Sequence, residues 1–268
     1  MSLIRIKGKN MLSIKNKIVL VTGASSGIGM ACVKAFVALG AKVIMGARRI
    51  EKMYQIMDEL EVPKEQVLIV KLDVQNQKEV EAMVQSLPDA WKNIEILVNN
   101  AGVALSSDAI QVGDSKNWDI MIDTNIKGLL YVTRAILPDM IKRGVGHIIN
   151  MGSIAGQACY PGGNVYAATK HAVRAISQSL RLDLMGTNIR VSEVQPGAVE
   201  TEFSVVRWND QEKANAFYQD FIPLIGDDIA DAVVYCATRK PHVNVSEIVV
   251  MPVAQASVNH IHRNKENI

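Results

Sequence analysis

The sequence predicts a single α/β domain with a doubly wound parallel sheet, and two observations lead to this prediction. Short apolar segments of strand length alternate with longer segments of helical periodicity along the chain. Parallel strands need such helical crossovers, which cover both faces of the sheet. The chain can also build a large core, since 49% of its 268 residues are hydrophobic. We therefore expect a Rossmann-type sheet of about seven strands.

The predicted elements follow one another in a regular order. A β-branched run at residues 18–21 precedes a glycine-rich turn and a helical pattern at 30–39, which Gly40 ends. Further strands are predicted at residues 43–45, 67–72, 96–98, 148–149, 191–194 and 248–250. Further helices are predicted near residues 51–60 and 78–86, after residue 98, and at 165–184 and 229–238. The domain is expected to cover residues 16–268, with residues 1–15 as an N-terminal extension.

One segment departs from this order. Residues 203–226 lie between a strand and the last helix, and they carry the aromatic residues Trp208, Phe217, Tyr218 and Phe221. An insertion of this kind beside a strand end is typical of a lid over a binding site, and we expect a substrate lid here. The alternative is a surface excursion whose rings only pack on the body.

Charge, cysteines and histidines argue against several classes of protein. The 29 Lys and Arg residues against 27 Asp and Glu leave a net charge of +2, which does not favour a nucleic-acid ligand. No apolar run reaches the roughly 18 residues of a membrane span, and lysines interrupt the first segment, so neither a membrane segment nor a signal peptide is predicted. The three cysteines are far apart, and the histidines lack a metal-site spacing. We expect a cytoplasmic protein without a metal.

A glycine-rich turn between the first strand and the first helix is typical of a dinucleotide site. There the backbone N–H groups and the positive end of the helix dipole face the pyrophosphate, and glycines let the backbone approach it closely. The spacing is GxxxGxG, and its place between strand and helix strengthens the interpretation over a purely structural turn. The expected contacts are Gly23, Ser25, Ser26, Gly27, Ile28 and Gly29.

The second predicted strand indicates which dinucleotide is bound. An NAD site would offer a carboxylate about 20 residues after the glycines, whereas an NADP site needs a cation for the 2′-phosphate. Arg48 and Arg49 stand at this position, with no carboxylate at the strand end. Arginine binds phosphate in a bidentate way, so NADP is favoured. The alternative is that both arginines only decorate a helix N-terminus, where the dipole opposes cations.

Three polar residues follow the fifth strand in a pattern that suits proton transfer. Tyr166 and Lys170 lie four residues apart in a predicted helix and therefore share one face. A nearby ammonium favours the phenolate, so we expect Lys170 to lower the pKa of Tyr166 and let it exchange a proton with an alcohol or carbonyl substrate. Ser153, at a strand end, can hold the substrate oxygen. A packed tyrosine beside a solvated lysine is the alternative for the pair alone.

Together with Asn99-Asn100-Ala101-Gly102, Asn125 and Pro196-Gly197, these motifs closely resemble the short-chain dehydrogenase/reductase family over nearly the whole chain. The resemblance implies that Asp73 and Val74 contact the adenine and that Asn100 lies along the cofactor. It implies that Lys170 binds the nicotinamide ribose and that Asn125 holds a water in a proton relay. It also implies contacts on the nicotinamide side from Pro196, Gly197, Val199 and Thr201.

Within the family, four stretches look like the NADP-dependent 3-hydroxy acid dehydrogenases, which include serine and L-allo-threonine dehydrogenases: residues 121–125, 160–166, 201–204 and 251–255. We therefore expect a small 3-hydroxy acid, or its carbonyl form, as the substrate. Arg207 would bind its carboxylate, unless this arginine pairs with a lid carboxylate such as Glu202 or Asp210.

Other functions and assemblies remain open on the sequence alone. A broad aldehyde or ketone reductase is the nearest alternative, and a non-catalytic NADP(H)-binding protein is the alternative from another class. Retention of Asn125, Ser153, Tyr166 and Lys170 argues against the latter. By the resemblance, the apolar stretch at residues 248–256 packs in a subunit interface, so a homotetramer is expected. Burial within its own subunit is the alternative.

Overall fold

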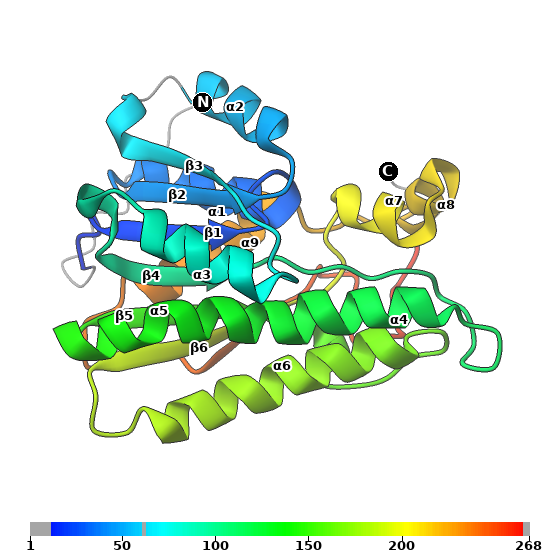
Figure 1. Ribbon diagram of the computed structural model, residues 1–268. Coiled ribbons are helices and arrows are strands. Elements are labelled where there is room, and N and C mark those ends of the chain that lie inside the picture. The colour runs from blue at the N-terminus through cyan, green and yellow to red at the C-terminus, as the bar shows by residue number, and fades with distance from the viewer. Residues whose placement is uncertain (1–11, 61–62, 265–268) are drawn as a thin grey trace.

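A computed structural model describes residues 12–60 and 63–264 (Figure 1). Seven strands form one sheet in the order β3-β2-β1-β4-β5-β6-β7, and every neighbouring pair is parallel. This confirms the predicted doubly wound Rossmann-type α/β fold. The strands are β1 (Ile18–Thr22), β2 (Lys42–Ala47), β3 (Val67–Lys71), β4 (Ile94–Asn99), β5 (Gly146–Met151), β6 (Ile189–Pro196) and β7 (Glu247–Val250).

Two hydrophobic cores lie on opposite faces of the sheet, because successive side chains of a strand point to opposite faces. Along β1, Val19 and Val21 belong to one core and Leu20 to the other. The first core is covered by α1 (Gly27–Ala38), α2 (Ile50–Glu59) and α9 (Gly226–Ala237). The second is covered by α3 (Gln77–Ser86) and α5 (Leu129–Arg143), with α4 (Ser115–Ile122) and α6 (Asn164–Asp183) packed against each other beside it.

Two boundaries differ from the sequence prediction. Ile14 is 2% exposed and belongs to the first core, and the Leu12 N–H donates to the Thr238 carbonyl at 2.8 Å. The folded domain therefore includes residues 12–15, which were predicted to belong to the N-terminal extension. Residues 1–11 of that predicted extension lie outside the described residues. α1 begins at Gly27, earlier than the predicted residue 30, because the last glycines of the turn form the first helical turn.

The single helix expected after residue 98 is instead three consecutive segments. Between α4 and α5 the chain forms a π-helical segment, Asp123–Gly128, whose backbone keeps the helical direction. Such segments occur often at functional sites. Asn125 lies within this one.

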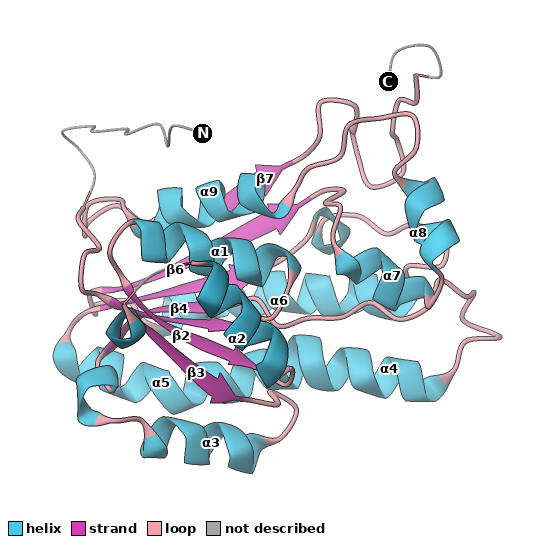
Figure 2. Cartoon of the chain, turned by 90° about the horizontal axis from the view of Figure 1, so that it is seen from above, coloured by secondary structure: helices cyan, strands magenta, loops and turns pink. Residues whose placement is uncertain are grey.

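The strand order places a binding site at one edge of the sheet. β1 pairs with β2 on one side and with β4 on the other, so the chain changes direction across the sheet at this point. Ligands of doubly wound sheets bind beyond the carboxyl ends of the strands at this switch point. Two short helices of the predicted lid, α7 (Glu202–Trp208) and α8 (Gln211–Phe217), stand beyond these strand ends (Figure 2).

Candidate active site

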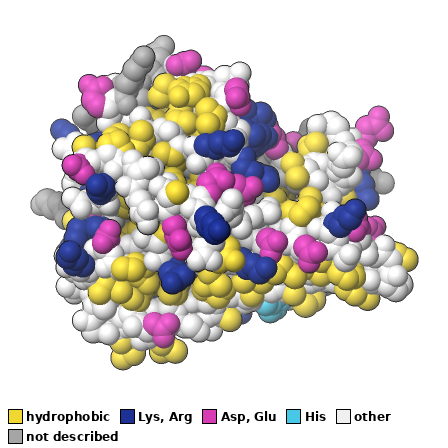
Figure 3. Space-filling view, viewed as in Figure 1, with side chains coloured by type: hydrophobic (Ala, Val, Ile, Leu, Met, Phe, Trp, Pro, Cys, Tyr) yellow, Lys and Arg dark blue, Asp and Glu magenta, His cyan; other side chains and the backbone are white. Residues whose placement is uncertain are grey.

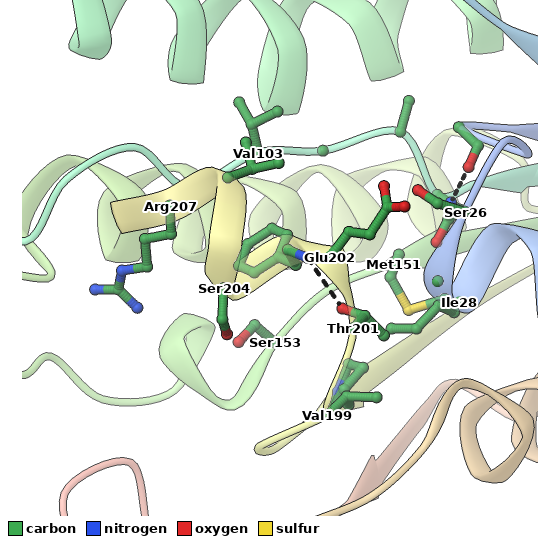
Figure 4. Close-up of a pocket in the computed structure, with 18 of the residues that line it drawn as sticks. Ser26, Ile28, Val103, Met151, Ser153, Val199, Thr201, Glu202, Ser204 and Arg207 are labelled. Carbon is green, nitrogen blue, oxygen red and sulfur yellow. Dashed lines mark hydrogen bonds between the residues drawn. The ribbon is translucent and has the colours of Figure 1, made fainter. Parts of the chain in front are cut away.

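A pocket of about 400 Å³ lies at the carboxyl ends of the strands, with α7 forming one wall. On the surface it is a hollow between the body and the lobe of α7 and α8, with charged side chains at its edge (Figure 3). Seen inside, the pocket runs from Ser26 at one end to Arg207 at the other, with Ser153 and Ser204 between them (Figure 4). All the predicted site residues line it except Gly29 and Asn125.

Gly29 shapes the phosphate end without lining it. A β-carbon at this position would overlap the Gly23 carbonyl oxygen and would lie 2.5 Å from Asn100 Nδ2. Only glycine therefore lets α1 pack against the turn and β4 at this spacing. Asn100 closes the arrangement, because its side-chain amide donates to the Thr22 carbonyl at 2.9 Å.

Arg49 lies at the outer edge of the same end and contacts three residues. Its guanidinium donates to Ser25 Oγ at 3.2 Å and to Ser26 Oγ at 2.7 Å, and it pairs with Glu202 of α7 at 2.8 Å. Lys52, one turn further along α2, pairs with the same carboxylate at 2.6 Å. Hydrogen bonds from Lys52 and then Arg49 lower the pKa of Glu202. Arg48 also lines the pocket and is exposed.

Burial decides the ionisation of Tyr166 and Lys170. It raises the pKa of Tyr166 to about 12, and the cation that opposes this rise is Arg207. The Lys170 Nζ atom lies 5.8 Å from the centre of the Tyr166 ring and donates to the Met151 carbonyl at 2.8 Å. Burial lowers the pKa of Lys170 to about 8. The expected lowering of the pKa of Tyr166 by Lys170 is therefore wrong for this structure, because burial raises that pKa and the groups that oppose the rise are Ser153 and Arg207, not Lys170.

Ser153 and Tyr166 meet at the centre of the pocket. A hydrogen bond with the Ser153 side chain lowers the pKa of Tyr166, although by less than burial raises it. Ser153 also begins a short 3₁₀ turn, Ile154–Gly156, and accepts a hydrogen bond from the Ala155 N–H. This bond fixes the hydroxyl at the end of β5. A hydroxyl and a phenol at one point are suited to hold and protonate a substrate oxygen.

Asn125 is 2% exposed and lies behind the pocket wall. Its amide nitrogen donates to the Val103 carbonyl at 2.8 Å and to Thr169 Oγ1 at 3.0 Å, and its Oδ1 accepts from the Val103 N–H. Both amide hydrogens are thus bonded within the protein, which leaves only oxygen atoms of Asn125 to hold a water. Asn125 also fixes the loop that carries Val103 into the pocket.

Aromatic side chains surround a cation at the far end of the pocket. The Arg207 guanidinium carbon lies 5.4 Å from the ring centre of Tyr160, 5.3 Å from that of Trp208 and 5.9 Å from that of Tyr166. Its Nε donates to the Ser106 carbonyl at 3.3 Å. Within residues 12–60 and 63–264, Arg207 has no ion pair, so the alternative of a pair with Glu202 or Asp210 is wrong.

The lid helices are joined to the pocket floor by hydrogen bonds. The Tyr218 hydroxyl, just after α8, donates to the Val199 carbonyl at 2.6 Å and contacts the Ser204 hydroxyl at 2.6 Å. Phe203 of α7 packs against Tyr166, with 5.8 Å between ring centres. The segment thus helps to bury the phenol.

Within residues 12–60 and 63–264, no group of three or more His, Cys, Asp or Glu residues is placed to bind a metal. No described helix is both long enough and apolar enough to span a membrane.

Residues 17–212 match the family model described as short chain dehydrogenase. The chain belongs to the short-chain dehydrogenase family. It is 47% identical over 249 residues to the NADP-dependent 3-hydroxy acid dehydrogenase of Escherichia coli strain K12, an alignment that covers 92% of this chain and 99% of that protein. It is 45% identical over 241 residues to sulfoacetaldehyde reductase 2 of Chromohalobacter salexigens, covering 89% and 95% of the two chains.

Solved structures of short-chain dehydrogenases share the fold closely. The closed form of serine dehydrogenase complexed with NADP⁺ superposes with a TM-score of 0.87 at 46% identity, covering 92% of this chain and all of that one. The serine dehydrogenase from Escherichia coli gives a TM-score of 0.78 at 44% identity, covering 89% of this chain and 99% of that one.

Four residues in or beside the pocket of this short-chain dehydrogenase were not predicted as site residues. Tyr160, Glu202 and Phe203 line the pocket, and Lys52 pairs with Glu202 beside it. Lys52 had a usable signal, because it lies in the first turn of a predicted helix, three residues after Arg49, and this spacing brings two side chains to the same side. No sequence signal indicated that Glu202 contacts Arg49, since the two residues are 153 positions apart in the chain.

Proposed function

We propose that this short-chain dehydrogenase transfers a hydride between NADP(H) and a small 3-hydroxy acid or its carbonyl form. The observation that carries the substrate class is Arg207, a cation without an ion-pair partner among the described residues, which lies in the pocket beside Tyr166. The similar proteins are named for 3-hydroxy acids, serine and sulfoacetaldehyde. Each of these molecules carries an anionic group on a short chain, as a substrate of Arg207 would.

The residues at the phosphate end fit NADP. The turn would hold the pyrophosphate through Gly23, Ser25, Ser26, Gly27 and Ile28, with Gly29 permitting the close packing. Arg48 and Arg49 would bind the 2′-phosphate, and Lys52 adds a third positive charge there. The remaining contacts would come from Asp73, Val74, Asn100, Lys170, Pro196, Gly197, Val199 and Thr201. When bound, the nicotinamide supplies or accepts the hydride.

The chain itself would position the substrate and move the proton. Ser153 would hold the substrate oxygen, and Tyr166 would donate a proton to it during reduction or accept one during oxidation. Because the pKa of Tyr166 is about 12 without cofactor, the phenol is held in its protonated form, which suits reduction directly. Oxidation requires additional positive charge near the phenol, which the nicotinamide ring of NADP⁺ would supply when the cofactor is bound. Asn125 would hold a water of the proton relay behind Lys170.

A comparison of two substrates tests the substrate class. Arg207→Ala should lower kcat/KM for L-serine by about tenfold to a hundredfold, because a charged hydrogen bond contributes about 1.5–3 kcal/mol. Its effect on an uncharged alcohol should be small. Equal losses on both substrates would show that Arg207 does not recognise the carboxylate. Wild-type activity on simple aldehydes equal to that on hydroxy acids would favour a broad carbonyl reductase.

We also propose a cytoplasmic homotetramer. All three cysteines are free, as expected in a reducing compartment. Val249, Met251 and Val253 expose 44%, 37% and 108% of their surfaces in the single chain, so these three apolar residues are not buried within their own subunit. Exposed apolar residues in one stretch favour a contact with another subunit. Sedimentation equilibrium of the wild type and of Val253→Asp tests this, since a mass of one subunit for the wild type would exclude the tetramer.

A further inference from the structure

Glu193 is a fully buried carboxylate in the middle of β6. It lies between Asn150 of β5 and Glu247 of β7 in the sheet. Neither of its carboxylate oxygens has a hydrogen-bond partner among the described residues. An ionised carboxylate in such a place is costly unless a positive charge lies close to it.

Gly152 brings this carboxylate to the base of the active site. A β-carbon on Gly152 would overlap Glu193 Oε1, so the carboxylate lies directly against this glycine. On one side of Gly152 is Met151, whose carbonyl accepts the hydrogen bond from Lys170 Nζ. On the other side is Ser153. The carboxylate and the ammonium therefore contact adjacent residues of one segment, and both are buried.

The charges that face Glu193 come from α6 and β7. Arg174 and Lys170 of α6 favour its ionised form, as does the polar side chain of Gln195 on the same strand, whereas Glu247 of β7 disfavours it. Burial exceeds these effects and raises the pKa of Glu193 to about 7. Burial lowers the pKa of Lys170 to about 8, and the negative charge of Glu193 opposes this lowering.

We infer that Glu193 is a positioning residue for the reaction, whose carboxylate beneath Gly152 keeps Lys170 protonated and held at the Met151 carbonyl. The inference rests on the proposed function for the role of Lys170 in catalysis. Glu193 touches neither substrate nor cofactor and acts only through the ammonium. A neutral side chain at position 193 would leave burial of Lys170 unopposed, so the lysine would lose its proton at a lower pH.

The pH profile of kcat/KM for carbonyl reduction tests this inference in the Glu193→Gln variant. Because the pKa of Tyr166 is about 12, loss of activity below about pH 10 reports another group, which we assign to Lys170. Glu193→Gln should lower kcat/KM about three- to tenfold at pH 8.5 and less than about twofold at pH 6, where Lys170 is protonated in both proteins. Glu193→Asp, which keeps the charge, should return the profile toward that of the wild type.

Glu247→Gln is the matched control, because it removes the same charge one strand further from Lys170 and should not move the alkaline limb to lower pH. A Glu193→Gln protein that loses activity equally at every pH, or not at all, would overturn the inference. Titration of ε-¹³C-labelled Lys170 by NMR needs no turnover, and it should give a lower lysine pKa in Glu193→Gln. A wild type inactive on every hydroxy acid would refute the proposed function, while this titration would still decide the role of Glu193.

Discussion

Arg49 and Glu202 join the phosphate end of the pocket to the lid: the guanidinium at the start of α2 and the carboxylate at the start of α7 form an ion pair at 2.8 Å. Both side chains are exposed, so the pair itself stabilises the fold by less than about 1 kcal/mol. The pair matters for cofactor binding. Glu202 of the lid pairs with Arg49 and Lys52, which are cations that we assign to the 2′-phosphate of NADP.

Removal of Arg49 should therefore weaken the binding of NADP much more than the binding of NAD. Arg49→Ala should raise the Kd for NADP about tenfold to a hundredfold, because the phosphate loses a charged hydrogen-bond donor, and should change the Kd for NAD less than about twofold. Isothermal titration with both cofactors measures this. Lys34→Ala, which removes a cation on α1 that pairs with Glu59, should alter neither value. Equal losses for both cofactors would contradict the assignment.

Neutralising Glu202 should have the opposite effect. In Glu202→Gln, Arg49 and Lys52 no longer pair with a carboxylate, so NADP should bind about two- to fivefold more tightly at low salt. The gain should shrink as salt is added. Glu200→Gln, an equal change of charge two residues away, provides the control. Weaker NADP binding in Glu202→Gln would instead mean that the carboxylate helps to hold the cofactor.

The stability of the protein should depend on pH through Glu193. Its pKa is raised from 4.5 to about 7 in the folded chain, so the folded state binds the proton more tightly than the unfolded state. The resulting stabilisation is present below about pH 4.5 and is lost as the pH rises through 7. The free energy of unfolding of Glu193→Gln should therefore exceed that of the wild type by an amount that grows by about 1–3 kcal/mol between pH 5 and pH 8. Urea denaturation measures it, and a difference independent of pH would contradict the burial of an ionisable carboxylate.

The fold and most of the pocket could be predicted because their signals are local. Strands such as β1 are continuous apolar runs, and the turn from Gly23 to Gly29 must lie between a strand and a helix to serve a phosphate. The burial of Ile14 had no such signal, since a short segment before the first strand does not show which part of the core it packs against. Glu193 had a weak signal, as a carboxylate within an apolar strand.

The ionisation of Tyr166 could not be predicted from the spacing of Tyr166 and Lys170. The spacing places both on one helical face, but it does not give the desolvation by Phe203 and the rest of the lid. That contact joins residues 37 positions apart in sequence, since 203 − 166 = 37. Burial depends on such distant contacts, so the direction of the pKa shift requires the structure.

Tyr166→Phe tests the proton-transfer role of Tyr166 directly, through its kcat with NADP and L-serine measured beside its Kd for NADP. If Tyr166 transfers the proton, the variant should bind NADP within about twofold of the wild type and lose at least about a hundredfold in kcat, because a positioned general acid or base contributes about 10²–10⁴. Turnover within a few-fold of the wild type would show that the proton moves through another group.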